Sequence, residues 1–200
     1  MKQDDIRLKL IDGAIHVIAR DGLDKATTKH ISTETGINEA YIYRCFSHKE
    51  DLINKAFEML DDELVTKVMQ HLPIMYETSV EYELRCRFLF AAIWTYMIGS
   101  YDRCIAYVQY YYSPYFIRYA AEMHKQRYKP VVEKFRDAFR DEADVWMILN
   151  HILNVMLDFA VKVHHGQMSG GDNYSEHVFR VIYASVKQYF RKPEGSDSEV

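Results

Sequence analysis

Apolar residues recur at spacings of three and four along most of the chain, which is the pattern of amphipathic α-helices. Only four prolines and eight glycines interrupt this pattern. Both residue types disrupt regular helices, and both are scarce here. The sequence therefore predicts an all-α protein.

The first third of the chain predicts four helices, of which the third is short. Asn38 is the expected N-cap of that short helix, and its Ile42 and Phe46 are the expected apolar anchors. Ser47 and Glu50 have the spacing of a capping box, which would start a long fourth helix. The expected helices cover about residues 4–20, 27–36, 39–45 and 47–70.

Beyond Pro73 the periodicity predicts five more helices, at about residues 77–99, 102–112, 114–139, 142–165 and 173–191. We expect two domains, a smaller one at residues 1–47 and a larger one at residues 48–192. The long fourth helix would join them without a flexible linker. Residues 193–200 are polar and are expected to form a disordered tail.

The charge of the chain is divided unevenly. The formal net charge is −4, which argues against a general binder of polyanions. Residues 1–49 carry eight basic and seven acidic groups, whereas the remainder carries a net charge of −5. If the N-terminal segment binds DNA, it must use a few well-placed cations and helix ends, and its affinity should depend strongly on salt.

Composition narrows the class of protein further. Cys45, Cys86 and Cys104 have no metal-ligand spacing, and we expect reduced thiols in a cytoplasmic protein, with a redox-sensing thiol as an open alternative. The longest apolar run, residues 88–98, is too short to span a membrane, and the N-terminus lacks the core of a signal peptide. Glycine-rich phosphate loops and GxSxG or HExxH motifs are absent from the sequence, so we expect neither an enzyme nor a cofactor or metal site.

Residues 27–46 predict a helix-turn-helix. Gly36 supplies the backbone freedom for a tight turn between two short helices, and Ile31, Ile37 and Ile42 would fasten them to the first helix. The second short helix then keeps an exposed face, and a helix presented in this way fits the major groove of DNA. An ordinary helical hairpin is the alternative interpretation.

The pattern over about residues 6–57 resembles the TetR family of regulators. The features that carry the resemblance are an apolar first helix ending at Asp21-Gly22-Leu23, and then Thr27-Thr28, Ile31, Gly36-Ile37, Tyr43, Phe46, Lys49-Glu50 and Leu52. The resemblance implies a three-helix DNA-binding domain followed by a larger helical ligand-binding domain. Ser32 and Glu39-Ala40 depart from the usual family pattern, so the operator sequence cannot be transferred.

The resemblance also suggests roles for individual residues. Thr28 and Tyr43 would donate to phosphates, and Lys49 would be a phosphate cation at a helix N-terminus. For Tyr43 the alternative is a buried aromatic strut, and for Glu39 it is a helix-start charge without a base contact. The expected base readers are Asn38, Glu39, Ala40 and Tyr41, with Lys29 or Arg44 reaching a phosphate or a guanine.

The last two expected helices are strongly apolar. Residues 142–165 are apolar on nearly every side, and a second stripe runs through Tyr174, Val178, Ile182, Val186 and Tyr189. In TetR-like proteins the last two helices pair with their copies in a four-helix bundle. The resemblance thus implies a homodimer on a palindromic double-stranded DNA operator. Alternatively, both helices only close the core of the monomer.

Aromatic residues are dense on the helices that wall the ligand cavity in this family. An apolar or aromatic small molecule is the expected effector, because tyrosines provide apolar faces with single hydroxyls. We expect a repressor that its ligand releases from the operator; the alternative is a TetR-like protein-interaction module that does not bind DNA. The expected pocket residues are Trp94, Met97, Tyr107, Tyr111, His151, Val155 and Phe159.

Overall fold

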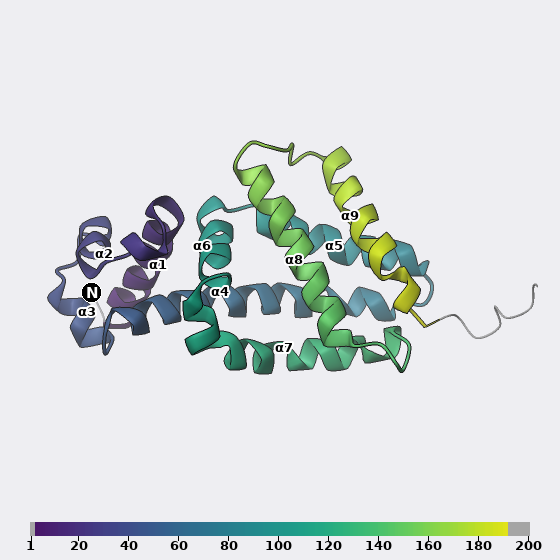
Figure 1. Cartoon of the computed structure of the whole chain (residues 1–200), viewed down its shortest axis with the longest axis horizontal. Helices are drawn as coiled ribbons and strands as arrows, with labels where there is room; N and C mark the ends of the chain where they lie inside the picture. Colours follow the sequence, from purple (N-terminus) through teal and green to yellow (C-terminus); the bar gives the residue numbers. More distant parts are fainter. Residues whose placement is uncertain (1–2, 192–200) are drawn as a thin grey trace, which may run out of the picture.

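A computed structural model describes residues 3–191, and within them the chain forms nine α-helices (Figure 1). The first three helices form one end of the elongated molecule, and the remaining helices form a larger body at the other end. The all-α prediction is confirmed. The helices are α1 (Gln3–Asp21), α2 (Thr28–Thr35), α3 (Ala40–Cys45), α4 (Lys49–His71), α5 (Tyr82–Ile98), α6 (Tyr101–Tyr111), α7 (Ala121–Phe135), α8 (Val145–His164) and α9 (Asp172–Val186).

Local capping explains where the N-terminal helices begin and end. The side chain of Thr27 accepts a hydrogen bond from the amide of His30 and so caps α2, and Gly36 ends this helix in the left-handed conformation with φ of 67°. The side chain of Asn38 accepts from the amide of Ala40 at 2.9 Å, which stabilises the first turn of α3. The sequence alone indicates helix ends at Thr27, Gly36 and Asn38.

The predicted capping box of α4 is wrong by one residue. His48 is the N-cap, and its Nδ1 accepts from the amide of Asp51 at 3.1 Å. The carboxylate of Asp51 accepts in return from the amide of Ser47 at 3.0 Å. Because the helix starts at Lys49, Asp51 and not Glu50 occupies the third helical position, from which a side chain can reach back.

Two of the later helices are shorter than the periodicity predicts. Residues 77–81 form a turn in which the carboxylate of Glu77 accepts from the hydroxyl of Ser79 at 2.6 Å, so α5 starts only at Tyr82. The single helix predicted at 114–139 is three segments: a π-helical turn η3 (Phe116–Ala120), α7, and a 3-10 turn η4 (Arg136–Ala138). Periodicity alone does not reveal such changes of helical winding.

The C-terminal end of the described chain is fastened to the end of α7. Helix α9 stops at Val186 and continues as a 3-10 turn, so the helix predicted to 191 is shorter. The amide of Arg140 donates to the carbonyl of Tyr189 at 2.9 Å, and the amide of Arg191 donates to the carbonyl of Ala138 at 3.0 Å. The tail expected at 193–200 lies outside the described residues.

Helix α4 runs from the N-terminal end of the molecule through the larger body, where it packs against α5, α6 and α7 (Figure 1). Its buried apolar stripe runs from Leu52 to Leu64, and Val68 is half-buried. Helix α1 packs against both α4 and α6. The two ends are therefore connected by a continuous helix and by a packed helix pair.

Polar contacts reinforce the packing of α1 on α6. The Nδ1 atom of His16 lies 2.7 Å from a carboxylate oxygen of Asp102. The amide of Leu23, just after α1, donates to the side-chain oxygen of Gln109 at 3.0 Å. This last bond satisfies a backbone group at the turn after α1, so α6 fixes where α1 ends.

Among the described residues, α8 is long and apolar enough to cross a membrane by length and composition alone. Core helices of globular proteins have the same character. One face of α8 is packed against α5, α6, α7 and α9. Met147 is exposed on its outer side, and Val155 and Phe159 are half-buried at the edge of the core.

Candidate DNA-binding surface and apolar cavity

One face of helix α3 is packed against the other N-terminal helices, and the opposite face is exposed. Ile42 is fully buried against the other N-terminal helices, whereas Tyr41, Tyr43 and Arg44 are exposed. The nine residues predicted to contact DNA all lie on α2, α3, the turn between them or the start of α4. Six of them are exposed and three are half-buried; the half-buried ones are Thr28, Glu39 and Lys49.

Tyr43 is 59% exposed, which rules out the alternative of a buried strut. The guanidinium of Arg44 lies 5.0 Å from the ring centre of Tyr41, so the two side chains stack on the outer face of α3. Lys49 stands in the first turn of α4, and its Nζ lies 3.8 Å from the carboxylate of Glu50. These groups offer a hydroxyl and two cations to an approaching phosphate backbone.

Thr28 and Glu39 contact each other. The hydroxyl of Thr28 donates to the carboxylate of Glu39 and thereby links the first turn of α2 to the residue that precedes α3. Both residues were predicted to contact DNA separately. In the structure the Thr28 hydroxyl already has an acceptor, which favours the alternative that Glu39 is a helix-start charge.

Arg7 positions α3 and was missed in the sequence. Its Nη1 donates to the carbonyl of Cys45 at 2.5 Å, and its guanidinium lies 4.5 Å from the ring centre of Phe46. The side chain thus satisfies one of the open carbonyls at the C-terminal end of α3. Spacing in the sequence gives no signal for this contact, because Arg7 and Cys45 are 38 residues apart.

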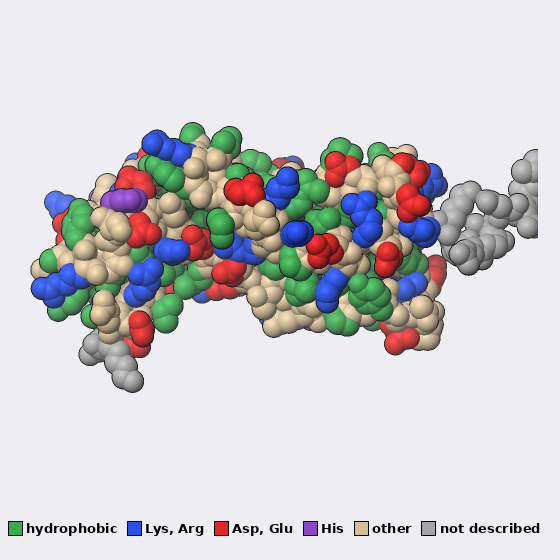
Figure 2. Space-filling view, turned by 90° about the horizontal axis from the view of Figure 1, so that it is seen from below, with side chains coloured by type: hydrophobic (Ala, Val, Ile, Leu, Met, Phe, Trp, Pro, Cys, Tyr) green, Lys and Arg blue, Asp and Glu red, His purple; other side chains and the backbone are tan. Residues whose placement is uncertain are grey.

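On the face seen in Figure 2, the lysine and arginine side chains of the N-terminal end do not form a large basic patch. Figure 2 shows lysine and arginine side chains interspersed with aspartate and glutamate along the visible face of the molecule. This arrangement agrees with the small net charge of residues 1–49. Any DNA contact made by this end depends on individual cations rather than on a broad basic patch.

A buried polar cluster lies in the middle of α4. Asp61 is fully buried, and its carboxylate lies 3.0 Å from Nδ1 of His124 and 2.5 Å from Nη1 of Arg127, both on α7. It also accepts from the hydroxyl of Tyr107 on α6 at 3.2 Å. One carboxylate therefore connects three helices, and removing it would leave the buried His124 and the mostly buried Arg127 without this acceptor.

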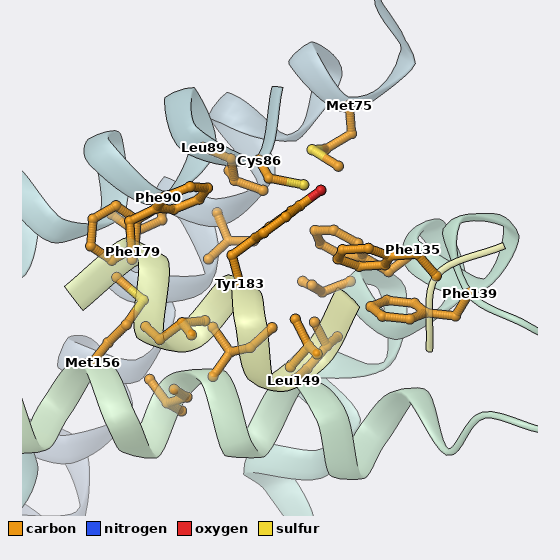
Figure 3. A pocket seen from close by; sticks show the side chains of 18 of the residues that line it. Met75, Cys86, Leu89, Phe90, Phe135, Phe139, Leu149, Met156, Phe179 and Tyr183 are labelled. Carbon is orange, nitrogen blue, oxygen red and sulfur yellow. The ribbon is translucent and has the colours of Figure 1, made fainter. Parts of the chain in front are cut away.

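An apolar cavity of about 140 Å³ lies beyond this cluster, between α4, α5, α7, α8 and α9 (Figure 3). Phe90, Phe179, Phe135 and Phe139 line it together with methionine, leucine and isoleucine side chains. Among the residues that the structure describes, its lining contains no aspartate, glutamate, lysine, arginine or histidine. The cavity suits an uncharged apolar molecule, because a charge would lose its hydration there without a partner.

Of the seven residues predicted to line a ligand pocket, Met97 lies in the wall of this cavity. Trp94 packs on Phe90 in the core instead. Tyr107 and Tyr111 have their hydroxyls directed to Asp61 and Asn150. The other three, all on α8, do not line the cavity: His151 is exposed, and Val155 and Phe159 are half-buried against the core.

Most of the apolar stripe predicted on α9 faces the interior of the monomer. Val178, Ile182 and Val186 are buried within the monomer, and the last two line the cavity. Val181 and Tyr174 are the exposed apolar residues of α9. The sequence identified an apolar stripe, but it could not tell which partner the stripe covers.

Few polar groups line the cavity, and all belong to tyrosines or a cysteine. The hydroxyls of Tyr82 and Tyr128 are buried and have no hydrogen-bond partner within the described part of the chain. Burial raises the pKa of the Cys86 thiol to about 12. In Figure 3 the hydroxyl of Tyr183 points between Cys86 and Met75.

The chain matches known regulators in sequence and in fold. Residues 10–56 match the family model described as bacterial regulatory proteins of the TetR family. The HTH-type nicotine-responsive transcriptional repressor HdnoR of Paenarthrobacter nicotinovorans is 29% identical over 96 residues, which are 48% of this chain and 47% of that protein. The alignment thus spans about half the length of this relative.

Solved structures extend the similarity over nearly the whole chain. A putative TetR-family regulator from Shewanella sp. PV-4 has a TM-score of 0.76 at 13% identity, covering 96% of this chain and 100% of that one. A TetR-family regulator from Marinobacter aquaeolei VT8 has a TM-score of 0.75 at 12% identity with the same coverage. At these identities the likeness shows the fold. Together these findings show a TetR-type helix-turn-helix sequence at residues 10–56, within a chain that has the fold of TetR-family regulators.

Proposed function

We propose that the chain is a homodimeric repressor that binds a palindromic DNA operator through α3 and leaves it when a small apolar or aromatic ligand enters the cavity. The observation that carries this proposal is the pairing of an exposed α3 face with an apolar cavity at opposite ends of α4. Leu64 and Val68, near the far end of α4, line the cavity, and Lys49 begins the same helix at the other end.

In this proposal Tyr43 and Lys49 contact phosphates, and Asn38, Ala40 and Tyr41 face the base edges. Asn38, Ala40, Tyr41 and Tyr43 are exposed, which supports their assignment. The half-buried Lys49 is supported by its position at a helix N-terminus. Lys29 and Arg44 are exposed cations on either side of the turn, which suits a phosphate or a guanine. The Thr28–Glu39 bond holds α2 against α3 and presents both helices as one unit.

The outer faces of α8 and α9 support the proposed homodimer. Met147 and Val181 are each 54% exposed, and the half-buried Val155 and Phe159 lie on the same helix as Met147. An apolar surface of this kind is typical of an interface. A two-fold axis through these helices would space two α3 helices for two half-sites of an operator.

Ligand entry would act through α4 and α6. To lower operator affinity, the ligand must bind more tightly to the conformation that does not bind DNA. The cavity borders α4. Helix α6 contacts α1 through the ion pair of Asp102 with His16, and it accepts a hydrogen bond at Gln109 from the amide of Leu23 just after α1. A shift of either helix would therefore move the DNA-contacting end of one protomer relative to its partner.

The dimer is tested by sedimentation at micromolar concentration. Met147→Glu combined with Val181→Glu should convert a dimer into a monomer, because it places charges in an apolar interface. Leu84→Glu, at an exposed apolar residue of α5, is the matched control and should remain dimeric. A monomeric wild-type protein would contradict the proposal.

A further inference from the structure

The cavity combines an uncharged wall with a buried hydroxyl that has no partner. Tyr128, on α7, is only 8% exposed and lines the cavity. Its hydroxyl lies beside the hydroxyl of Tyr107 and makes no hydrogen bond of regular geometry within the described residues. A buried polar group without a partner is costly, and it is rare unless something else satisfies it.

In a hydrogen bond with a ligand, the Tyr128 hydroxyl can be assigned as the donor. Burial raises the pKa of Tyr128 well above its ordinary value of 10, so the hydroxyl keeps its proton at neutral pH. The neighbouring Tyr107 hydroxyl already donates its own proton to Asp61. A ligand atom at Tyr128 is therefore best placed as a hydrogen-bond acceptor, such as a carbonyl oxygen.

From the cavity and this hydroxyl we infer that the effector is a neutral molecule of about the size of one aromatic ring with a small substituent, whose carbonyl or ether oxygen accepts from Tyr128. This inference rests on the proposed function and names the ligand class of the same site. Apolar cavities of about 150 Å³ bind benzene, and this one measures about 140 Å³. A protonated amine or a carboxylate would find no opposite charge in the wall.

The position of Tyr128 also links the ligand to α4. Its hydroxyl is next to Tyr107, and Tyr107 donates to Asp61 in the middle of that helix. Arg127, the neighbour of Tyr128 in the chain, binds the same carboxylate. An oxygen placed against Tyr128 thus lies beside the polar cluster that holds α4 to α6 and α7.

The test is a cycle of two probes and two variants. Acetophenone and α-methylstyrene have the same shape and differ in an oxygen atom replaced by a methylene group. Binding of each is measured by calorimetry or ligand-observed NMR on the wild-type protein, on Tyr128→Phe and on Tyr82→Phe. Tyr82→Phe is the matched control, because it removes the other unpartnered hydroxyl of the cavity, on a residue that is only half-buried.

We expect Tyr128→Phe to weaken acetophenone roughly five- to tenfold and to leave α-methylstyrene unchanged, as the loss of one hydrogen bond predicts. Unchanged α-methylstyrene binding also shows that the variant keeps its cavity. Equal acetophenone binding in the wild type and Tyr128→Phe, or a loss in Tyr82→Phe instead, would overturn the assignment of Tyr128. Benzoate or α-methylbenzylammonium binding as tightly as acetophenone would overturn the neutral class.

The same experiment separates this inference from the proposed function. If α-methylstyrene binds but Tyr128→Phe has no effect on acetophenone, the cavity is still a ligand site and only the polar contact is wrong. If neither neutral probe binds the wild-type protein up to its solubility limit, the cavity is not an effector site. Both the inference and the ligand-release part of the proposed function then fail.

Discussion

The hydroxyl of Thr28 donates a hydrogen bond to the carboxylate of Glu39, so the start of α2 and the start of α3 are joined at the surface that faces DNA in our proposal. This contact changes the expected role of an acidic residue beside a DNA-contacting helix. The contact fixes the relative position of the two helices, and we propose that Glu39 does not read a base. Its negative charge then opposes the approach of phosphates.

Glu39→Gln should therefore strengthen operator binding. Glutamine can still accept from Thr28, while the repulsion between the carboxylate and the DNA backbone is removed. We expect roughly a two- to fivefold gain in affinity at about 0.1 M salt. Fluorescence anisotropy with a selected operator measures it, and Glu142→Gln, an exposed acid far from α3, is the control. A loss of affinity confined to operators with cytosine at one position would instead assign Glu39 to that base.

Tyr43 and Lys49 should be separable by their dependence on salt. Lys49→Ala should weaken DNA binding and reduce the slope of log K against log salt by about 0.9, because one phosphate contact by a cation is lost. Tyr43→Phe should lower affinity several-fold through one lost hydrogen bond and leave that slope unchanged. Lys187→Ala, an exposed lysine at the other end of the molecule, is the control. Unchanged affinity in both variants would refute the phosphate assignments.

Gly13 should be required for the packing of α1 on α2. A Cβ atom at this position would lie 2.2 Å from the Cγ2 methyl of Thr35. The Thr35 hydroxyl is fixed, because it donates to the carbonyl of Ile31 at 2.8 Å and accepts from the amide of Ile37 at 3.2 Å. Gly13→Ala should lower the free energy of unfolding by about 1–3 kcal/mol, measured by thermal or urea denaturation.

The rescue variant makes this prediction specific. Thr35→Ser keeps both hydrogen bonds and removes the methyl that an alanine at position 13 would meet. Combined with Gly13→Ala it should recover most of the lost stability, and alone it should cost little. If the double variant is no more stable than Gly13→Ala, the clash with Thr35 is not the cause.

Cys86 and Cys104 should react slowly in the folded protein. Burial raises the pKa of each thiol to about 12, so very little thiolate is present at pH 8. Their alkylation by iodoacetamide should be far slower than that of a free thiol, and it should accelerate as the pH approaches 12. Mass spectrometry after timed labelling at pH 8 measures this. Rapid labelling of either cysteine in the folded protein would contradict this prediction and support the redox-sensing alternative.

The N-terminal third of the chain could be predicted well because its signals are local. Thr27, Gly36 and Asn38 act on backbone groups within three residues, so their capping roles can be seen in the sequence. The sequence also contained the signal for Asp61, which lies on the same helical face as Phe57 and Leu64. The pattern alone does not reveal its burial, because acidic residues are rarely fully buried unless they are paired.

The walls of the apolar cavity could not be predicted from the sequence, for a physical reason. A helix with apolar residues on most sides, such as α8, gives no indication of which side covers a cavity. His151 and Phe159 were expected to line a pocket, but His151 is exposed and Phe159 packs half-buried against the core outside the cavity. Ile182 and Val186 belong to a stripe expected at a dimer interface or, alternatively, in the monomer core, and they line the cavity. Long-range contacts such as Arg7 with Cys45 leave no periodic trace either.

The most direct test of the account is selection of operators from a random pool of double-stranded DNA with the full-length wild-type protein. We predict enrichment of one dyad-symmetric sequence, bound by two chains per site and lost in the Tyr43→Phe, Lys49→Ala double variant. Recovery of no sequence above the starting pool, by a protein that is folded and dimeric, would contradict the claim that α3 reads DNA.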